Sequence, residues 1–196
     1  MGTGDRIAKS VPSTRIIVDD LVLRPFVRDD ARELMEAITE SIEHLRPWMP
    51  WIQFEPQDIH DKRKLIKEFS QEWDSRSGFP MGIFHGDHLV GASGYHVRGP
   101  EDSLEIGYWV RLGHTRKNIA KRTTRALIDE AFRLPEIARV FINHDQANVA
   151  SGRIPQSLGF ALFATVEREP MSPGDSGLLQ QWVMTREAWL LKRLDQ

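Results

Sequence analysis

The apolar residues of this chain change their spacing along the sequence, and that change limits the folds open to it. From Asp30 to the proline at position 47 they recur at helical intervals, and they do so again over 58–76. Residues 79–97 instead fit two strands joined by a tight turn at 85–88. Two helices followed by paired strands predict a layered domain in which helices cover a sheet.

The rest of the sequence alternates strands with helices. Asp30 and Glu33 fit a capping box at the start of the first helix. Further elements are predicted as strands with a turn between them over 15–26, a strand over 104–110, a helix over 120–134 that ends at Pro135, a strand over 137–145, a short helix over 146–159, and strands over 160–168 and 178–186. The expected fold is α+β (mixed α/β), with one mostly antiparallel sheet. Residues 1–13 are predicted to form a flexible tail, and residues 14–196 a single domain.

Composition excludes several classes of function. Charged residues make up 28% of the chain and the net charge is -2, so no overall basic field indicates nucleic-acid binding. The absence of cysteine removes disulfides, thiolate metal sites and a cysteine nucleophile. No histidine or carboxylate cluster has metal-ligand spacing, so no metal is expected. No segment has the length of a membrane span, and the N-terminus lacks a signal-peptide core, which together predict a cytoplasmic protein.

A basic turn joins the strand at 104–110 to the helix that follows it. The sequence GHTRKNIAKRTTRAL, residues 113–127, stands where nucleotide-binding proteins often carry a glycine-rich loop. Arg116 and Asn118 occupy places that glycine would take in such a loop. Two interpretations are open from this stretch alone: a phosphate-binding turn, or a solvated basic helix start without a ligand.

Five segments in this order resemble the GNAT superfamily of acyl-CoA-dependent N-acyltransferases, and most of all its RimJ/RimL-like branch. They are LVLRPFVRDDARELMEAI, LRPWMPW, LEIGYWV, the basic turn with its helix, and NVASGRIPQSLGF. The resemblance covers roughly residues 15–190. It implies a GNAT fold of about seven strands, with the middle strands splayed apart, and about four flanking helices. It also implies acetyl-CoA (or coenzyme A) as co-substrate and a primary amine as acceptor, either a peptide N-terminus or a small molecule.

The resemblance implies where the cofactor would bind. The family holds the pyrophosphate on backbone N–H groups of a turn that corresponds here to residues 115–120. Ala120 fits the family pattern, whereas Thr115 and Asn118 depart from it. Asparagine tolerates the left-handed backbone better than other non-glycine residues, so the turn can keep its shape. The remaining implied contacts are charged groups of Arg116 and Lys117, the backbone of Ile119, and pantetheine pairing with the backbone of Trp109, Val110 and Arg111.

The resemblance also implies candidate catalytic residues. Many family members protonate the departing thiolate with a tyrosine whose place is taken here by Pro155, while RimL-like proteins use a serine at the position of Ser151. Asn148 would contact the cofactor or order the loop. A plain helix cap for Asn148 and a packing role for Ser151 are the alternatives. Glu105 is the candidate base, and the alternative is a carboxylate paired with arginine; His96 and His144 are weaker candidates.

The acceptor side is expected to lie beside Trp48, Met49 and Trp51, together with the loop before the last strand. The alternative is that these aromatic side chains only cover the sheet. Nothing in the sequence names the acceptor. A non-catalytic acyl-CoA-binding protein and an enzyme that uses a larger donor, such as succinyl-CoA, remain open as other functions. An exposed edge at the C-terminal end of the sheet suggests a homodimer as a further hypothesis.

Overall fold

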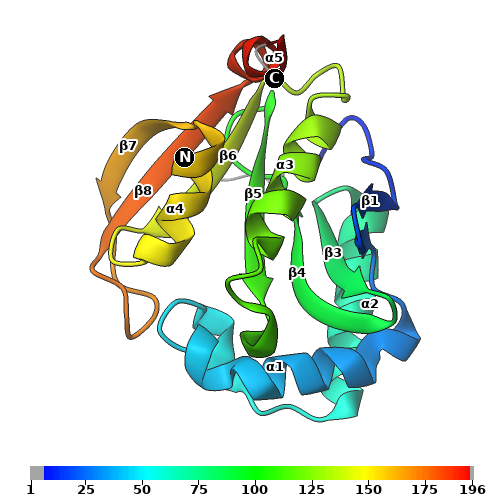
Figure 1. Ribbon diagram of the computed structural model, residues 1–196. Coiled ribbons are helices and arrows are strands. Elements are labelled where there is room, and N and C mark those ends of the chain that lie inside the picture. The colour runs from blue at the N-terminus through cyan, green and yellow to red at the C-terminus, as the bar shows by residue number, and fades with distance from the viewer. Residues whose placement is uncertain (1–6, 195–196) are drawn as a thin grey trace.

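A single eight-stranded sheet forms the centre of the protein in the computed structural model, which describes residues 7–194. Its strands lie in the order β1-β2-β3-β4-β5-β6-β8-β7 (Figure 1). Their bounds are β1 Ile16–Val18, β2 Leu21–Arg24, β3 Gly78–His85, β4 His88–His96, β5 Ser103–Val110, β6 Arg139–Asp145, β7 Ala161–Glu167 and β8 Leu178–Thr185. Every neighbouring pair is antiparallel except β5 and β6. The prediction of a mixed, mostly antiparallel sheet is therefore confirmed.

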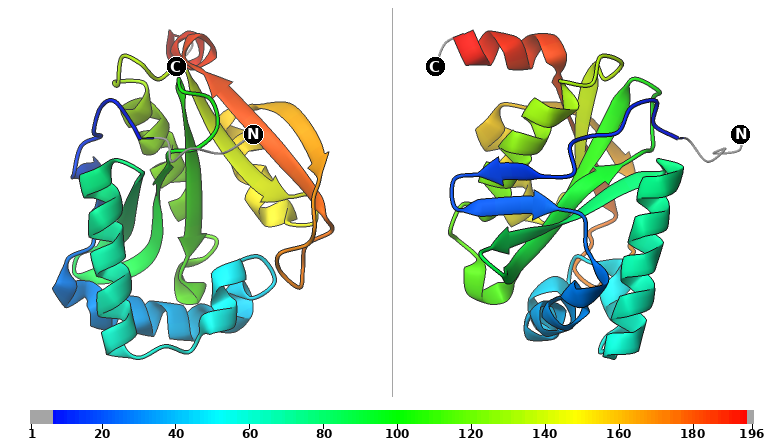
Figure 2. Two further views of the ribbon diagram at one scale, coloured as in Figure 1. Left: turned by 180° about the vertical axis from the view of Figure 1, so that it is seen from behind. Right: turned by 90° about the vertical axis from the view of Figure 1, so that its right-hand side faces the viewer.

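Helices cover both faces of this sheet (Figures 1 and 2). Helices α1 (Ala31–Leu45) and α2 (Ile59–Ser75) lie on one face, and α3 (Ile119–Ala131) and α4 (Val149–Leu158) lie on the other. A fifth helix, α5 (Arg186–Leu194), follows β8 and was not predicted. Its Trp189 is buried and donates a hydrogen bond from Nε1 to Asp129 at 2.9 Å. None of the helices within residues 7–194 combines the length and apolar character needed to cross a membrane.

The central strands β5 and β6 pair over only three residues each. Ser103, Leu104 and Glu105 lie opposite residues 139–141, and no pairing follows beyond Glu105. Each strand is held along its other side, because β5 pairs with β4 up to Val110 and β6 pairs with β8 over its whole length. The two backbones therefore diverge toward their C-terminal ends, as Figure 1 shows. This is the splay that the resemblance implied.

The N-terminal segment corrects one prediction. Residues 7–13 are not a free tail: Ala8 N donates to the Arg76 carbonyl at 2.9 Å, Ser10 binds Glu136, and Ser13 N and Oγ both donate to Glu130 at 2.7 Å. The sequence suggests that these polar residues face solvent. In the structure they bind carboxylates of residues more than a hundred positions away. Residues 1–6 of the predicted tail lie outside the described residues.

The predicted capping box at α1 is also wrong. Asp30 makes no side-chain cap to α1, but accepts hydrogen bonds from Arg24 at 2.7 and 2.8 Å and from Val27 N at 2.7 Å. Glu33 accepts from Leu89 N at 3.0 Å instead of turning back to the helix start. Both carboxylates thus bind strands, or the turn before the helix, rather than the helix end.

The connection from α1 to α2 is fixed by a buried ion pair. This connection carries the 3-10 helix Pro50–Phe54 and the tryptophans of the expected acceptor side. Lys62 of α2 is fully buried and binds the carboxylate of Glu55, which is 3% exposed, while the Gln57 side chain accepts a second bond at 2.9 Å. A buried charge without its partner is strongly unfavourable, so this pair holds the connection against α2.

Edge strand β7 presents apolar side chains to solvent. Leu162, Phe163 and Val166 are each more than 40% exposed, and the ring of Phe163 meets that of Phe141 edge-on at 5.7 Å. A homodimer through this edge stays a prediction.

The buried ion pair yields a stability prediction. Replacing Lys62 with Met leaves Glu55 charged and buried without a cation, and should lower the free energy of unfolding by about 3–5 kcal/mol. The double change Lys62→Met with Glu55→Gln should recover much of that loss. Lys64→Met, which breaks an exposed pair with Asp61, is the control and should cost at most about 1 kcal/mol. Urea denaturation measures all three. Equal losses in the Lys62 and Lys64 variants would show that the buried pair does not anchor the connection.

Candidate functional site

The basic turn before α3 has an unusual backbone. Arg116 and Asn118 both adopt left-handed conformations, with φ of 59° and 57°. The expectation that Asn118 could take this conformation agrees with the structure, whereas Arg116 was not expected to take it. Asn118 makes no side-chain cap to α3, and Ile119 is buried and anchors the helix start in the core. The turn is thus shaped by two left-handed residues in place of glycine.

This backbone leaves a row of donors unused. Among the described residues, no backbone N–H from Arg116 to Lys121 has a hydrogen-bond partner. Unpaired N–H groups together with the positive end of the α3 dipole form an anion-binding site of the kind that holds phosphate. Arg116 and Lys117 are exposed beside it. Arg122 is not available, because it pairs with Asp19 and Asp20.

The backbone contribution expected of Arg111 needs correction. Its N–H donates to the Val90 carbonyl and its carbonyl accepts from His114 N, both at 2.9 Å. The guanidinium binds Glu40 and Glu33. Because backbone groups alternate in direction along a strand, Trp109 also turns its N–H and carbonyl toward β4, while Val110 turns them toward the gap between β5 and β6. Of the three residues expected to pair with pantetheine, Val110 is the one whose backbone faces the gap.

Ser151 meets a residue that the sequence did not single out. Its Oγ lies 3.2 Å from the hydroxyl of Tyr108, which is also 3.1 Å from the Ser151 carbonyl oxygen. Burial raises the pKa of Tyr108 to about 12, although the hydrogen bond with Ser151 opposes this shift. Asn148 caps α4, since its side chain accepts a hydrogen bond from Ser151 N at 3.1 Å. The sequence gives no local sign of this contact, because Tyr108 and Ser151 lie 43 residues apart.

His144 supports α4 and is not free to act as a base. Trp182 Nε1 donates to Nε2 of His144 at 2.9 Å, so the ring proton sits on Nδ1 and is donated to the Asp145 carbonyl at 2.7 Å. Burial lowers the pKa of His144, although the hydrogen bond to the Asp145 carbonyl opposes this shift, and the lowered pKa keeps the ring neutral. A Cβ at Gly152 would lie 2.8 Å from Cε1 of this ring. The glycine therefore lets α4 rest directly on His144.

Glu105 lies where the pairing of β5 and β6 ends. It is 7% exposed and accepts hydrogen bonds from Arg98 Nε at 2.7 Å and from Asn143 Nδ2 at 2.8 Å. A second guanidinium nitrogen binds its other carboxylate oxygen. Glu105 is thus a carboxylate paired with arginine, which is the alternative given in the sequence analysis. Its role as a base stays a prediction. His96 lies opposite Glu105 on β4.

Of the three acceptor-side candidates, Trp48 lies against the loop before β8, and Met49 and Trp51 pack on the core. Trp51 packs against Trp109, with ring centroids 6.2 Å apart, and Met49 packs on the core beneath α1. Gly174 N donates to the Pro47 carbonyl at 2.9 Å, and a Cβ at Gly174 would lie 3.1 Å from the ring of Trp48. The loop before β8 therefore touches the connection between α1 and α2, as the sequence predicted.

Asp145, at the end of β6, anchors this loop. Its carboxylate accepts hydrogen bonds from Ser176 N and Oγ, from Gly177 N and from Ala147 N, at 2.7–3.1 Å. Burial alone would raise the pKa of Asp145, but these hydrogen bonds outweigh it and lower the pKa from 3.8 to about 2. One carboxylate thus joins the start of α4 to the loop before β8.

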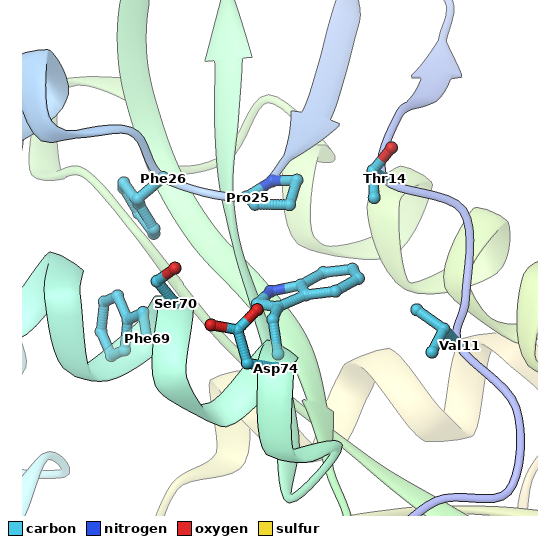
Figure 3. A pocket seen from close by; sticks show the side chains of 8 residues that line it. Val11, Thr14, Pro25, Phe26, Phe69, Ser70 and Asp74 are labelled. Atoms are coloured by element: carbon cyan, nitrogen blue, oxygen red, sulfur yellow. The ribbon is translucent and has the colours of Figure 1, made fainter.

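A cavity lies away from these residues. It has a volume of about 310 Å³ and is found between the N-terminal segment, the end of β2 and α2 (Figure 3). Its lining includes Phe26, Phe69 and Trp73. None of the candidate site residues lines it. No group of three metal-ligating side chains occurs within residues 7–194.

Comparisons with known proteins agree with this geometry. Residues 20–161 match the acetyltransferase (GNAT) domain. The ribosomal-protein-serine acetyltransferase of Escherichia coli (strain K12) is 24% identical over 147 residues, which cover 74% of this chain and 82% of that protein.

Two solved structures are also similar. RimL, a ribosomal L7/L12 alpha-N-protein acetyltransferase in complex with coenzyme A, aligns with a TM-score of 0.81 at 19% identity, covering 89% of this chain and 99% of that one. Mycobacterium smegmatis RimJ in complex with CoA-disulfide aligns with a TM-score of 0.75 at 21% identity, covering 88% and 86%. At these identities the structural likeness shows the fold.

The lowered pKa of Asp145 predicts acid sensitivity. A carboxyl whose folded pKa lies below its ordinary value stabilises the protein above that ordinary value and loses this contribution as the pH falls through the folded pKa. For Asp145 the window runs from 3.8 down to about 2, and the contribution near neutral pH is about 2 kcal/mol. Asp145→Asn should therefore unfold more easily at neutral pH, with a deficit that shrinks as the pH falls through this window.

Urea unfolding at a series of pH values measures this deficit. Asp87→Asn, in the exposed turn between β3 and β4, is the control and should follow the parent curve. A deficit in Asp145→Asn that stays constant down to the lowest pH would contradict the assignment.

Proposed function

Because the chain belongs to the GNAT acetyltransferase family, whose domain matches residues 20–161, we propose that it transfers the acetyl group of acetyl-CoA to the N-terminal α-amine of a protein. The observation that carries the proposal is the juxtaposition at the open end of β5 and β6. Unpaired N–H groups at the start of α3 stand at the end of one strand, and Ser151 at the start of α4 stands at the end of the other.

The cofactor would lie across this open end. Its pyrophosphate would bind the free N–H groups from Arg116 to Lys121, and its pantetheine would pair with the backbone of Val110 inside the gap. Arg116, Lys117 and the first residues of α3, Ile119 and Ala120, would surround the phosphates. Asn148 would act by capping α4 rather than by touching the cofactor.

The reaction would be a direct attack of the amine on the thioester in a ternary complex. The chain contains no cysteine to form a thioester intermediate. Ser151 would give its hydroxyl proton to the departing thiolate. The acceptor site would be lined by Trp48, Met49 and Trp51.

The state of Glu105 favours an α-amine as acceptor. Its carboxylate is already engaged by Arg98 and Asn143, which leaves it poorly placed to take a proton. An α-amine with a pKa near ~8 is about 10% neutral at neutral pH, whereas a lysine amine near ~10.4 is only about 0.04% neutral. An α-amine therefore needs far less help from a base. The names of the E. coli relative and of RimL point to ribosomal proteins as acceptors.

Release of the coenzyme A thiol tests the proposal. We expect turnover with acetyl-CoA and peptides that have a free α-amine, and much less with N-acetylated peptides whose amine is a lysine. Succinyl-CoA as donor tests the larger acyl group. Ser151→Ala should lower kcat by about 10²–10⁴-fold with little change in acetyl-CoA affinity. Ser157→Ala, an exposed serine on the same helix, is the matched control. If no amine supports thiol release while acetyl-CoA binds, the chain is an acyl-CoA-binding protein and not an enzyme.

The left-handed backbone of Asn118 predicts how the turn tolerates substitution. Asn118→Gly should keep or improve acetyl-CoA affinity, because glycine adopts this conformation without strain. Asn118→Val should weaken binding about 10-fold, since a β-branched residue enters the left-handed region only at a cost of ~1–2 kcal/mol. Arg116→Ala should weaken binding modestly and more at low salt, because an exposed contact to phosphate is screened.

Titration calorimetry with acetyl-CoA measures these affinities. Equal binding by Asn118→Val and the parent would show that the basic side chains, and not the backbone, hold the phosphates.

A further inference from the structure

The carbonyl of Ser151 lacks the partner that an α-helix normally provides. In α4 this oxygen would accept a hydrogen bond from the backbone N–H four residues further on, and that residue is Pro155. Proline has no N–H, and its ring also pushes away the carbonyl of the residue four positions earlier. A backbone acceptor in the first turn of α4 therefore needs a donor from outside the helix.

Tyr108 supplies that donor from strand β5. Its hydroxyl oxygen lies 3.1 Å from the Ser151 carbonyl oxygen and 3.2 Å from Ser151 Oγ. A tyrosine hydroxyl carries one proton, and a carbonyl oxygen can only accept. The tyrosine proton therefore points to the carbonyl, and Ser151 Oγ, at a similar distance, shares the same proton in a bifurcated hydrogen bond. Ser151 accepts in this contact and keeps its own proton for the departing thiolate.

We propose that Tyr108 and Pro155 are a positioning pair for Ser151: the proline frees the Ser151 carbonyl, and the tyrosine that binds this carbonyl also orients the Ser151 hydroxyl. The inference rests on the proposed function, in which that hydroxyl protonates the thiolate. Because burial raises the pKa of Tyr108 to about 12, against the opposing hydrogen bond with Ser151, the tyrosine keeps its proton near neutral pH and stays a donor to the carbonyl.

The proton balance of the transfer needs no further group. The amine nitrogen bonds to the acyl carbon and the C–S bond breaks. The sulfur takes the proton of Ser151, the surplus proton of the nitrogen leaves to solvent, and Ser151 takes a proton back from solvent. Tyr108 holds the serine hydroxyl in one orientation before the transfer and itself gives up no proton.

The other side of α4 is held independently of Tyr108. Gly152 rests on the ring of His144, which Trp182 and the Asp145 carbonyl fix in one orientation. Removing the Tyr108 hydroxyl should therefore release the Ser151 side chain and carbonyl without displacing the whole helix.

A double-mutant cycle in stability tests the pairing. Tyr108→Phe leaves the Ser151 carbonyl without a donor and should raise the unfolding equilibrium constant about tenfold. Pro155→Ala returns a backbone N–H to that carbonyl. In the Pro155→Ala background, the same Tyr108→Phe change should raise the constant less than about threefold. Equal effects in both backgrounds would overturn the pairing, whether or not the protein has activity.

Kinetics test the orienting role. Tyr108→Phe should lower kcat about tenfold, the loss expected for one hydrogen bond that orients the donor, and should change KM for acetyl-CoA by less than about twofold. The double variant should regain stability but not kcat, because its carbonyl is satisfied while its Ser151 hydroxyl is still free to rotate. If kcat recovers together with stability, Tyr108 has only a structural role and the orienting role is overturned.

Tyr95→Phe is the matched control. Tyr95 also donates its hydroxyl proton to a helix carbonyl, that of Leu127, at 2.5 Å, and it lies in the core. The Tyr95→Phe variant should lose stability, and its kcat should be unchanged. Absence of turnover in the parent protein would overturn the proposed function, and the stability cycle would still decide the pairing.

Discussion

The short parallel pairing of β5 with β6 is the constraint on which the rest of the site depends. These two strands share three residue pairs and then separate. Parallel strands have their C-terminal ends at the same edge of a sheet, and each of these strands leads into a helix on the same face, α3 from β5 and α4 from β6. The N-termini of both helices are therefore brought to the open end of the gap. The unpaired N–H groups of the basic turn and the Ser151 side chain reach the same region because of this topology.

Other parts of the fold keep the gap from closing. Pairing with β4 holds β5 up to Val110, and pairing with β8 holds the whole of β6, so each strand follows its other neighbour as the sheet twists. Side chains near the open ends are committed elsewhere. Asp145 binds backbone N–H groups of the loop before β8, and Arg111 binds α1. The backbone groups of Val110 that face the gap therefore have no partner on β6.

The sequence predicted the features that depend on neighbouring residues, and it missed the contacts between residues far apart in the chain. Apolar spacing located α1 to α4 and the central strands, and the tolerance of asparagine for left-handed backbone agreed with Asn118. Left-handed Arg116 has no such signal. The N-terminal segment looked free because Ser13 finds its partner, Glu130, only in the folded chain. The contact between Tyr108 and Ser151 has no local signal for the same reason, although a proline inside a helix, here Pro155, leaves a carbonyl in need of a donor.

Alternation along β5 divides the candidate groups between the two faces of the sheet. Tyr108 points to the face covered by α3 and α4 and meets Ser151 there, whereas Glu105 and Trp109 point to the opposite face. Trp51 and the loop before β8 lie on that opposite side. We infer that a thioester placed in the gap would expose its sulfur to the Ser151 side and its carbonyl to the tryptophan side. The amine would then attack the acyl carbon from one face of the sheet while the thiolate leaves it on the other, so neither would have to pass the other.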